Sequence, residues 1–342
     1  MFVKQFLKGS ENSVDSIILE TAREFNEGVL SVEYITTCRN IIYKAICKDN
    51  RFVIRLTNQQ VRTKEQIECE LQFQEYLFTN GADVTRPLIT TDNERVIECV
   101  IGTKRYYASA FTFAKGLNWD ERVDESPEML YQIGKALGKV HKLSKNYKVA
   151  TYKRRKWYEQ QELAEAPELF EEYSKELYTS FMSFVDQMKA LENDHDRYGL
   201  THGDYLMSNY MIDEGKVTII DFDESEYSWF AMDLAICIRC YLVGDEPERV
   251  SEKVERAERI HYNLLLGYQS ENTITNDMIY DLNKYIRVRD YIEIAQLLRI
   301  VKQGRTLCDI ENRLLKTDLE RVLYNRPFIE FDLSRISETF EN

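Results

Sequence analysis

One segment of the chain carries acidic and amide side chains at a spacing that suits the transfer of a phosphoryl group. It begins at His202-Gly203-Asp204 and continues through Asn209 to Asp221. Phosphoryl transfer depends on positioning and on neutralising charge, so it needs a carboxylate beside the attacking hydroxyl and hard oxygen ligands for magnesium. Asp204 can receive the proton, and Asn209 and Asp221 can hold the metal. Each residue alone is typical of a turn, but the three together at these offsets predict a catalytic loop.

The first third of the chain alternates between helix-like and strand-like patterns. Apolar residues at helical spacing predict helices over residues 14–27 and 64–78. Runs of β-branched and aromatic residues, with Asp49-Asn50 as a hairpin turn, predict strands over residues 29–37, 41–48, 51–57, 94–100 and 104–113. We therefore expect a small mixed sheet with one important helix in this part.

After Gly116 the pattern becomes almost wholly helical. Helices are predicted over residues 128–143, 157–163, 169–191, 231–242, 252–268, 277–282 and 285–301. One short hairpin over residues 210–222 follows Asn209 and carries Asp221 at its end. The order of elements, a small sheet followed by a larger helical part, predicts an α+β fold.

Several short motifs resemble those of one enzyme family. His202-Gly203-Asp204 stands where protein kinases have His-Arg-Asp, and Ile-Asp-Phe at 220–222 stands where they have Asp-Phe-Gly. With Met-Asp-Leu-Ala at 232–235 and Leu-Gly-Lys-Val-His at 137–141, these motifs resemble the aminoglycoside phosphotransferase and choline kinase-like superfamily, most closely its bacterial homoserine-kinase-like branch. The resemblance implies a bilobal protein kinase-like fold, with a nucleotide-binding lobe over 1–113 and a catalytic and acceptor-binding lobe over 114–342.

The same resemblance implies a reaction and a role for each residue. The family moves the terminal phosphate of ATP, with magnesium, onto a hydroxyl of a small molecule such as an aminoglycoside, choline or homoserine. Asp204 would be the catalytic base, and Asn209 and Asp221 would hold magnesium. His202 and Asp233 would support the catalytic loop. Asp233 also suits the start of a helix, where a carboxylate faces the helix dipole.

A phosphotransferase also needs a cation on the phosphates, held by a carboxylate of a nearby helix. Arg55, in the strand over 51–57, stands where the family has such a cation, and an arginine can fork onto phosphate oxygens. Glu70 in the following helix is its candidate partner, with Glu68 and Glu75 as competitors on the same helix. The alternative for Glu70 is a place on a solvated helix face.

Two further nucleotide contacts are less well defined by the sequence. The loop over residues 36–40 contains no glycine, although phosphate-binding loops usually contain one, so how tightly it closes is left open. Arg39 in this loop could contact phosphate or be an ordinary surface residue. Adenine is expected to meet backbone groups near Phe111 and Phe113. The sequence does not distinguish ATP from GTP as the donor.

An acidic and aromatic run suggests where the acceptor binds. Its charge and ring face would suit an ammonium-bearing alcohol, and its four candidate residues are Asp223, Glu224, Glu226 and Trp229. The alternative is a solvated acidic loop with the tryptophan in the core. The same cleft could be bordered by a late helix that carries Arg287, Arg289 and Asp290.

Two other functions use the same scaffold. One is that of a protein Ser/Thr kinase, but the short segment between Asp221 and Asp233 leaves little room for a long activation loop. The other is that of a non-catalytic nucleotide-binding protein, which commonly lacks the base or a metal ligand. Because Asp204, Asn209 and Asp221 are all present, we rank this function last.

Composition limits the partners and the location. The chain of 342 residues has a formal net charge of −13, and an acidic protein repels the phosphate backbone of nucleic acids. No window approaches about 18 uninterrupted apolar residues, so we expect no membrane span. Seven cysteines at unpaired spacings, without a secretion signal, predict reduced thiols and a cytoplasmic protein. The oligomeric state is left open.

Overall fold

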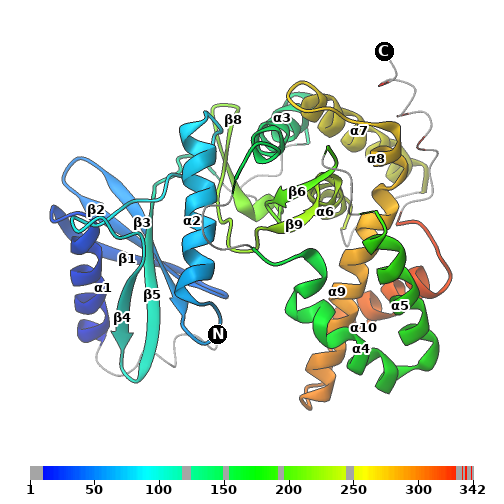
Figure 1. The fold of residues 1–342 in the computed structure, drawn as a ribbon, viewed down its shortest axis with the longest axis horizontal. Coiled ribbons are helices and arrows are strands. Elements are labelled where there is room, and N and C mark those ends of the chain that lie inside the picture. Colours follow the sequence, from blue (N-terminus) through cyan, green and yellow to red (C-terminus); the bar gives the residue numbers. More distant parts are fainter. Residues whose placement is uncertain are drawn as a thin grey trace. The chain divides into compact units, whose positions relative to one another are not determined.

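The structure, a computed structural model, describes residues 11–117, 125–148, 154–191, 196–243 and 250–328, and residues 333, 336 and 340. Contacts within the chain divide it into two compact units, which we describe one at a time (Figure 1). The first holds the described residues of Met1–Gly116, Tyr147–Lys153 and Thr218–Asp223. The second holds those of Leu117–Asn146, Arg154–Val217 and Glu224–Asn342. The lobe boundary between residues 113 and 114 stays a prediction.

The first unit is built around a five-stranded antiparallel sheet. In the order β1-β2-β3-β5-β4, its strands are β1 (Val29–Thr37), β2 (Ile41–Cys47), β3 (Arg51–Asn58), β5 (Lys104–Thr112) and β4 (Ile97–Ile101). The predicted turn at Asp49-Asn50 joins β2 to β3, and the amide of Cys47 donates to the carbonyl oxygen of Asn50 at 2.9 Å. The β-branched and aromatic runs thus form strands at the places where the sequence predicts them.

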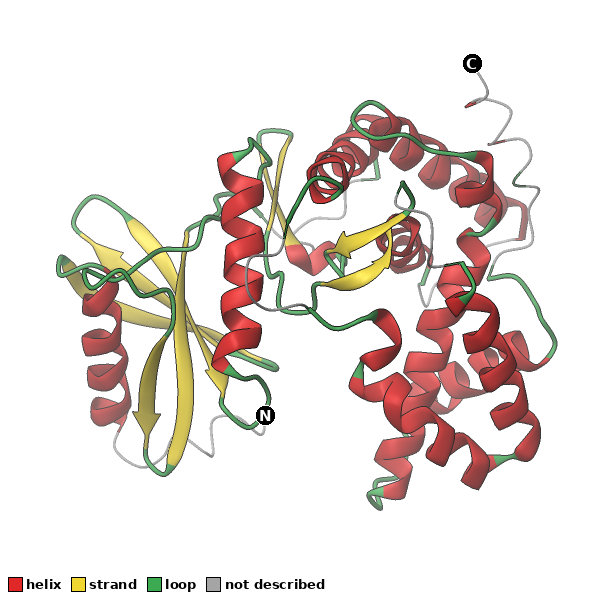
Figure 2. Ribbon diagram, viewed as in Figure 1, coloured by secondary structure: helices red, strands yellow, loops and turns green. Residues whose placement is uncertain are grey.

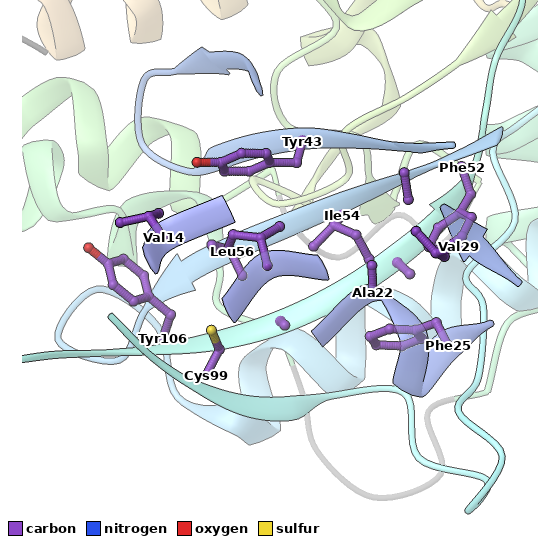
Figure 3. Packing of buried hydrophobic residues seen from close by; sticks show 14 residues of the cluster. Val14, Ala22, Phe25, Val29, Tyr43, Phe52, Ile54, Leu56, Cys99 and Tyr106 are labelled. Atoms are coloured by element: carbon purple, nitrogen blue, oxygen red, sulfur yellow. The ribbon is translucent and has the colours of Figure 1, made fainter. Parts of the chain in front are cut away.

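Helix α1 (Glu11–Phe25) covers one face of this sheet (Figure 1). Its buried apolar side chains recur every three or four residues, so they share one face of the helix: Val14, Ile18, Ala22 and Phe25. Every second residue of β3 meets them, as Figure 3 shows for Phe52, Ile54 and Leu56. Each such buried side chain stabilises the fold by about 1.5–3 kcal/mol.

The opposite face of the sheet packs against α2 (Lys64–Thr79). The helix begins at a capping box, in which Thr63 and Gln66 satisfy each other's backbone amides. The apolar side chains of α2 and the sheet gather around Val53. Because side chains alternate along a strand, Arg55 lies on the same face as Val53 and therefore points toward α2.

The second unit is mostly helical (Figure 2). Its helices are α3 (Pro127–Ser144), η2 (Trp157–Glu159), α4 (Gln161–Tyr173), α5 (Lys175–Lys189), η3 (Met207–Asn209), α6 (Phe230–Leu242), α7 (Val250–Gln269), α8 (Asn276–Tyr280), α9 (Leu282–Lys302) and α10 (Asp309–Leu323). Two short strands, β6 (Tyr198–Thr201) and β9 (Glu226–Trp229), pair antiparallel. The predicted hairpin after η3 is present as β7 (Tyr210–Asp213) and β8 (Lys216–Ile219).

Glycines allow α3 and α7 to pack closely against each other. A Cβ atom at Gly134 would lie 1.9 Å from the carbonyl oxygen of Leu264, and one at Gly267 would lie 1.9 Å from that of Tyr131. No side chain fits at such distances, so the two backbones can approach only where both residues are glycine. The contact holds the last turn of α3, which carries His141, against α7.

The predicted and observed elements differ in four places. The helix predicted over residues 157–163 is divided between η2 and the start of α4, which continues through residues 164–168, where no helix is predicted. The helix predicted over residues 169–191 is interrupted at Ser174, whose backbone is extended (φ −161°, ψ 139°) and whose hydroxyl accepts from the amide of Leu177 at 3.0 Å. The sequence patterns predict neither β6 nor β9, because strands of four residues are too short to show a clear alternation. They also predict no element where α10 forms.

Two expectations about the whole chain can be compared with the described residues. In these ranges, no helix combines the length and the apolar character needed to cross a membrane. All seven cysteines lie in the described ranges and are free thiols.

Candidate active site

The predicted catalytic loop begins directly after β6, at a turn that only glycine can make. Gly203 has φ +83°, a conformation that side chains disfavour. A Cβ atom there would also lie 2.1 Å from the carbonyl oxygen of Glu224. The turn separates its two neighbours: His202 is fully buried, whereas the side chain of Asp204 is 25% exposed.

Asp233, in the first turn of α6, binds the backbone of this loop. Its carboxylate accepts hydrogen bonds from the backbone amides of His202 at 2.7 Å and Gly203 at 2.9 Å. His141 Nε2 lies 3.0 Å from the same carboxylate. Asp233 is fully buried, so these hydrogen bonds compensate for its lost hydration. Asp233 thus lies at the start of a helix and contacts the loop, and its supporting role in catalysis stays a prediction.

His141 extends this support into a buried hydrogen-bonded chain. Burial lowers the pKa of His141, although the hydrogen bond to Asp233 acts in the opposite direction. This direction favours the neutral ring, in which Nε2 donates to the carboxylate of Asp233. Nδ1 then accepts from the hydroxyl of Tyr268 at 3.0 Å, and the oxygen of that hydroxyl accepts from Asn272 at 2.8 Å. The motif at 137–141 marks His141 in the sequence, but nothing local identifies Tyr268 or Asn272 as its partners.

Asp204 and Asn209 are oriented by contacts with each other. The side-chain amide of Asn209 donates to the backbone oxygen of Asp204 at 2.8 Å and to its Oδ2 at 3.3 Å. The backbone amide of Asp204 donates to His202 Nδ1 at 3.3 Å. The amide nitrogen of Asn209 is engaged in this way, while its amide oxygen accepts only a long contact of 3.5 Å from the Ser208 hydroxyl, which a cation could replace. The fully buried ring of His202 accepts from the backbone amide of Asp204 and packs edge-on against Tyr205, with ring centroids 5.7 Å apart, which suits a supporting role.

Arg289 of α9 lies beside the same carboxylate. Its Nη1 is 3.6 Å from Asp204 Oδ1, and its side chain is 19% exposed. This distance is that of an ion pair and is too long for a hydrogen bond. The sequence places Arg289 on a late helix but does not indicate that it reaches the catalytic loop.

In the first unit, Arg55 and Glu70 form a buried pair. The guanidinium donates two hydrogen bonds to the carboxylate, at 2.7 and 2.8 Å, and the side chains are 3% and 0% exposed. Burial alone lowers the pKa of Arg55, but the charge and hydrogen bonds of Glu70 outweigh it and raise that pKa. Of the three glutamates considered on α2, Glu70 is the one that pairs with Arg55. Glu75 pairs instead with Arg86 near the surface.

Asp221 stands at the end of the hairpin, next to this pair. Its Oδ1 accepts from Arg55 Nη1 at 3.4 Å, and its side chain is 46% exposed. Its backbone is in the left-handed region, with φ +59°, which non-glycine residues adopt mostly where surrounding structure enforces it. The carboxylate therefore reaches solvent from a fixed backbone position and beside a fixed cation.

Asp223 has a structural role that differs from the predicted contact with the acceptor. It is buried in the first unit, where its Oδ2 accepts from the Asn40 side chain at 3.2 Å and its Oδ1 accepts from Arg62 Nε at 3.2 Å. Asn40 ends the loop over residues 36–40, so Asp223 fixes one end of that loop. Sequence reasoning misses Asn40 and Arg62, because neither lies at a distinctive spacing from Asp223.

The other three residues of the acidic and aromatic run do not form the predicted amine-binding surface. Trp229 is fully buried against Trp157, with ring centroids 5.2 Å apart. Glu226 is also buried, and its burial raises its pKa to about 7 even though Arg155 and Gln160 act in the opposite direction. Arg155 forms ion pairs with both Glu224 and Glu226. The acidic charge is thus balanced within the second unit, and Trp229 belongs to the core.

The two phenylalanines predicted near adenine lie at the end of β5. Phe111 is buried within the strand, and its ring lies 5.0 Å from the guanidinium carbon of Arg55. Phe113 follows the strand, and its ring lies 4.2 Å from the guanidinium carbon of Arg51. Their backbone contact with a nucleotide stays a prediction.

The oxygen groups present fit magnesium better than a softer metal. No group of three or more His, Cys, Asp or Glu side chains in the described ranges could hold a metal ion by itself. Asn209 and Asp221 offer one amide oxygen and one carboxylate. Magnesium in phosphotransferases is typically held by one or two such groups together with phosphate oxygens and water, so this small donor set suits it.

Comparison with known proteins identifies the family of the chain. The sequence profile of the phosphotransferase enzyme family matches residues 40–268. Amicoumacin kinase of Bacillus subtilis (strain 168) is 24% identical over 326 residues, covering 94% of this chain and 96% of that protein. These matches confirm the family that the motifs predict.

Solved structures show the same fold. Amicoumacin kinase hAmiN in complex with AMP-PNP, Ca2+ and Ami superimposes with a TM-score of 0.78 at 20% identity, covering 95% of this chain and 99% of that one. A microcompartment-associated aminopropanol kinase superimposes with a TM-score of 0.65 at 16% identity, covering 91% and 98%. The predicted α+β fold is confirmed, and with most of its length matched the chain belongs to the phosphotransferase enzyme family.

Proposed function

We propose that this phosphotransferase moves the terminal phosphate of ATP onto a hydroxyl of a small molecule, with Asp204 as the catalytic base. The observation that carries the proposal is the catalytic loop. Asp233 holds the loop by two backbone amides, and Asn209 orients Asp204 so that its half-buried carboxylate is available to an incoming hydroxyl. A base placed in this way accepts the proton as the oxygen attacks the phosphate.

Each remaining residue has a task in this proposal. Arg55, held by Glu70, places a fixed positive charge where the phosphates of ATP are expected. Asn209 and Asp221 would hold magnesium, which when bound neutralises phosphate charge. Asn209 directly precedes β7, and Asp221 follows the last residue of β8 by two positions, so one short hairpin of the sequence carries both candidate ligands. These assignments rest on residue types, on sequence spacing and on the surroundings of each side chain.

The relatives support a small molecule as the acceptor. Their names record kinases that act on amicoumacin, aminopropanol, ethanolamine and choline. The short segment between Asp221 and Asp233 argues in the same direction, because protein kinases use a longer one to bind their peptide substrates. If the acceptor carries an amine, we expect residues other than Glu226 and Trp229 to bind it. We also propose the cytoplasm, where ATP is abundant and thiols stay reduced, as the location.

An assay of ADP release tests the proposal. The purified protein is given Mg-ATP and a panel of alcohols that includes aminoglycosides, choline, ethanolamine, aminopropanol and homoserine. Asp204→Asn should reduce turnover of the best acceptor by about 100- to 10,000-fold, because this is the usual contribution of general-base catalysis and the loop geometry is kept. Asp213→Asn is the matched control, since it makes the same change at an exposed aspartate of β7.

Two outcomes would contradict the proposal. Wild-type turnover by Asp204→Asn would remove Asp204 as the base. ADP release that occurs only with protein acceptors, or as autophosphorylation with ATP alone, would favour the protein-kinase alternative. Asp221→Asn checks the metal assignment, because it should raise the magnesium concentration needed for half-maximal rate at least about tenfold.

A further inference from the structure

Arg289 is aimed at the catalytic carboxylate but is not bound to it by a hydrogen bond. Its Nη1 lies 3.6 Å from Asp204 Oδ1. Among the described residues, the guanidinium of Arg289 forms an ion pair with Asp204 and with no other carboxylate. A guanidinium carries five N–H donors, and at 19% exposure much of the side chain is withdrawn from water. Donors withdrawn in this way are stabilised when an oxygen acceptor is bound to them.

Two other arginines of this region are satisfied by the protein itself. Arg299, on the same helix, forms ion pairs of 3.2 Å with both Glu162 and Glu165. Arg239 of α6 donates two hydrogen bonds to Glu293, at 2.8 and 2.6 Å. These side chains hold helices together. Arg289 differs from them because its one charged neighbour is the proposed base.

Holding Asp204 in place does not require Arg289. Asn209 already donates to both the backbone oxygen and Oδ2 of Asp204, and His202 accepts from its backbone amide. Oδ1 is the oxygen that faces Arg289. A hydroxyl that donates to Oδ1 at about 2.7 Å would lie alongside the guanidinium. The atoms attached to the carbon of that hydroxyl would then be next to the free donors of Arg289.

We propose that Arg289 is an acceptor-binding residue, and that it selects alcohols with a carbonyl or carboxylate oxygen close to the reacting hydroxyl. The planar fork of a guanidinium matches such oxygens and can donate to them in pairs. The inference rests on the proposed function and makes its acceptor class more specific. It also places the recognition of the acceptor on α9 and not on the acidic run at residues 223–226.

Three small alcohols that share one hydroxyl and one amine provide the test. Ethanolamine lacks a carbonyl group, serinamide adds a carboxamide, and serine adds a carboxylate. In the ADP-release assay, the wild type should have a higher kcat/KM for serinamide or serine than for ethanolamine. Arg289→Gln should lower kcat/KM for serinamide and serine by about 10- to 100-fold, mainly by raising KM. Its kcat/KM for ethanolamine should stay within about threefold of the wild-type value.

Two further variants control the experiment. Arg289→Lys keeps the charge but loses the fork, so its loss should be intermediate. Arg299→Gln removes an arginine of the same helix that pairs away from Asp204, and its preference among the three alcohols should equal that of the wild type. Thermal melting checks that each variant is folded. An equal loss with all three alcohols would overturn the proposal, because it would mean that Arg289 acts on Asp204 or on the phosphate.

Direct binding separates this inference from the proposed function. Saturation-transfer NMR measures the binding of serinamide and of serine to the wild type and to Arg289→Gln, in the presence of AMP-PNP and magnesium. If no alcohol supports ADP release, the proposed function fails, but tighter binding of either compound by the wild type still supports the role of Arg289. If the wild type binds neither compound more tightly than Arg289→Gln does, the assignment of Arg289 is wrong.

Discussion

Arg55 of β3 and Glu70 of α2 are joined by two hydrogen bonds, at 2.7 and 2.8 Å, in the interior of the first unit. The same guanidinium reaches Asp221 at 3.4 Å. Glu70 therefore sets both the position and the direction of the cation that we assign to the phosphates. A buried charge of this kind is stable only while its partner is present.

Glu70→Gln should weaken both folding and nucleotide binding. It leaves the buried charge of Arg55 without its compensating carboxylate, which costs about 3–5 kcal/mol of unfolding free energy. It also frees the guanidinium to turn toward Asp221, so the KM for ATP should rise at least about tenfold. Urea unfolding and ADP-release kinetics measure the two effects.

Glu75→Gln is the control for this prediction. Glu75 pairs with Arg86 near the surface, so this change should alter the free energy of unfolding by less than about 1 kcal/mol. An equal effect of the two variants would contradict the prediction.

Asp233→Asn should lower kcat much more than it changes the KM for ATP. One carboxylate oxygen becomes an NH2 group, which cannot accept from His202, Gly203 or His141, so the loop that carries Asp204 loses part of its support. We expect a destabilisation of about 2–4 kcal/mol. Asp309→Asn is the comparison, because it removes an exposed first-turn acid from α10, which should cost about 0.3–1 kcal/mol. If the two variants are equally stable, Asp233 serves only the helix dipole.

Gly203→Ala should inactivate the enzyme by displacing the catalytic loop. The new Cβ would meet the carbonyl oxygen of Glu224 at 2.1 Å, in addition to the unfavourable positive φ. Gly215→Ala separates these effects, since Gly215 has φ +82° with no atom within 4 Å of the new Cβ. We expect Gly215→Ala to lower stability by about 1 kcal/mol and to keep full activity. Comparable ADP release from both alanine variants would show that the contact with Glu224 does not position the loop.

His261 should make folding stability decrease in mildly acidic solution. Burial in α7 lowers its pKa from 6.5 to about 4, although its hydrogen bond to the carbonyl oxygen of Ala257 acts in the opposite direction. The folded state thus favours the neutral ring. Its contribution is fully present above pH 6.5 and is lost as the pH falls toward 4, by roughly 3 kcal/mol in total.

His261→Asn removes this titration while keeping a donor for Ala257. Urea unfolding of both proteins at several pH values between 4.5 and 7.5 measures the difference. The wild type should lose more stability than the variant as the pH falls. Parallel pH profiles of the two proteins would mean that His261 does not titrate in this range.

The sequence predicts the parts of the site that depend on short stretches of chain. Asp204, Asn209 and Asp221 lie within one loop and one hairpin, so their spacing alone predicts a catalytic loop. Arg55 and Glu70 lie on a strand and the helix that follows it. The alternation of β3 and the period of α2 turn both toward the same interface. Local patterns of this kind are readable because residues close in sequence can occupy few relative positions.

The acceptor side depends on packing between distant segments. Asp223 appears in the sequence as part of an acidic surface run, yet its partner Asn40 is 183 residues away. Arg155 and Arg289 likewise meet Glu224 and Asp204 only after the helices of the second unit have packed.

The sequence by itself therefore determined the family and the reaction class, and it predicts the base and the metal ligands. Only the tertiary structure decided which charges are already neutralised and that Trp229 belongs to the core. The physical reason is that residue type records what a side chain can do, whereas burial and the choice of partner depend on what the rest of the chain brings beside it.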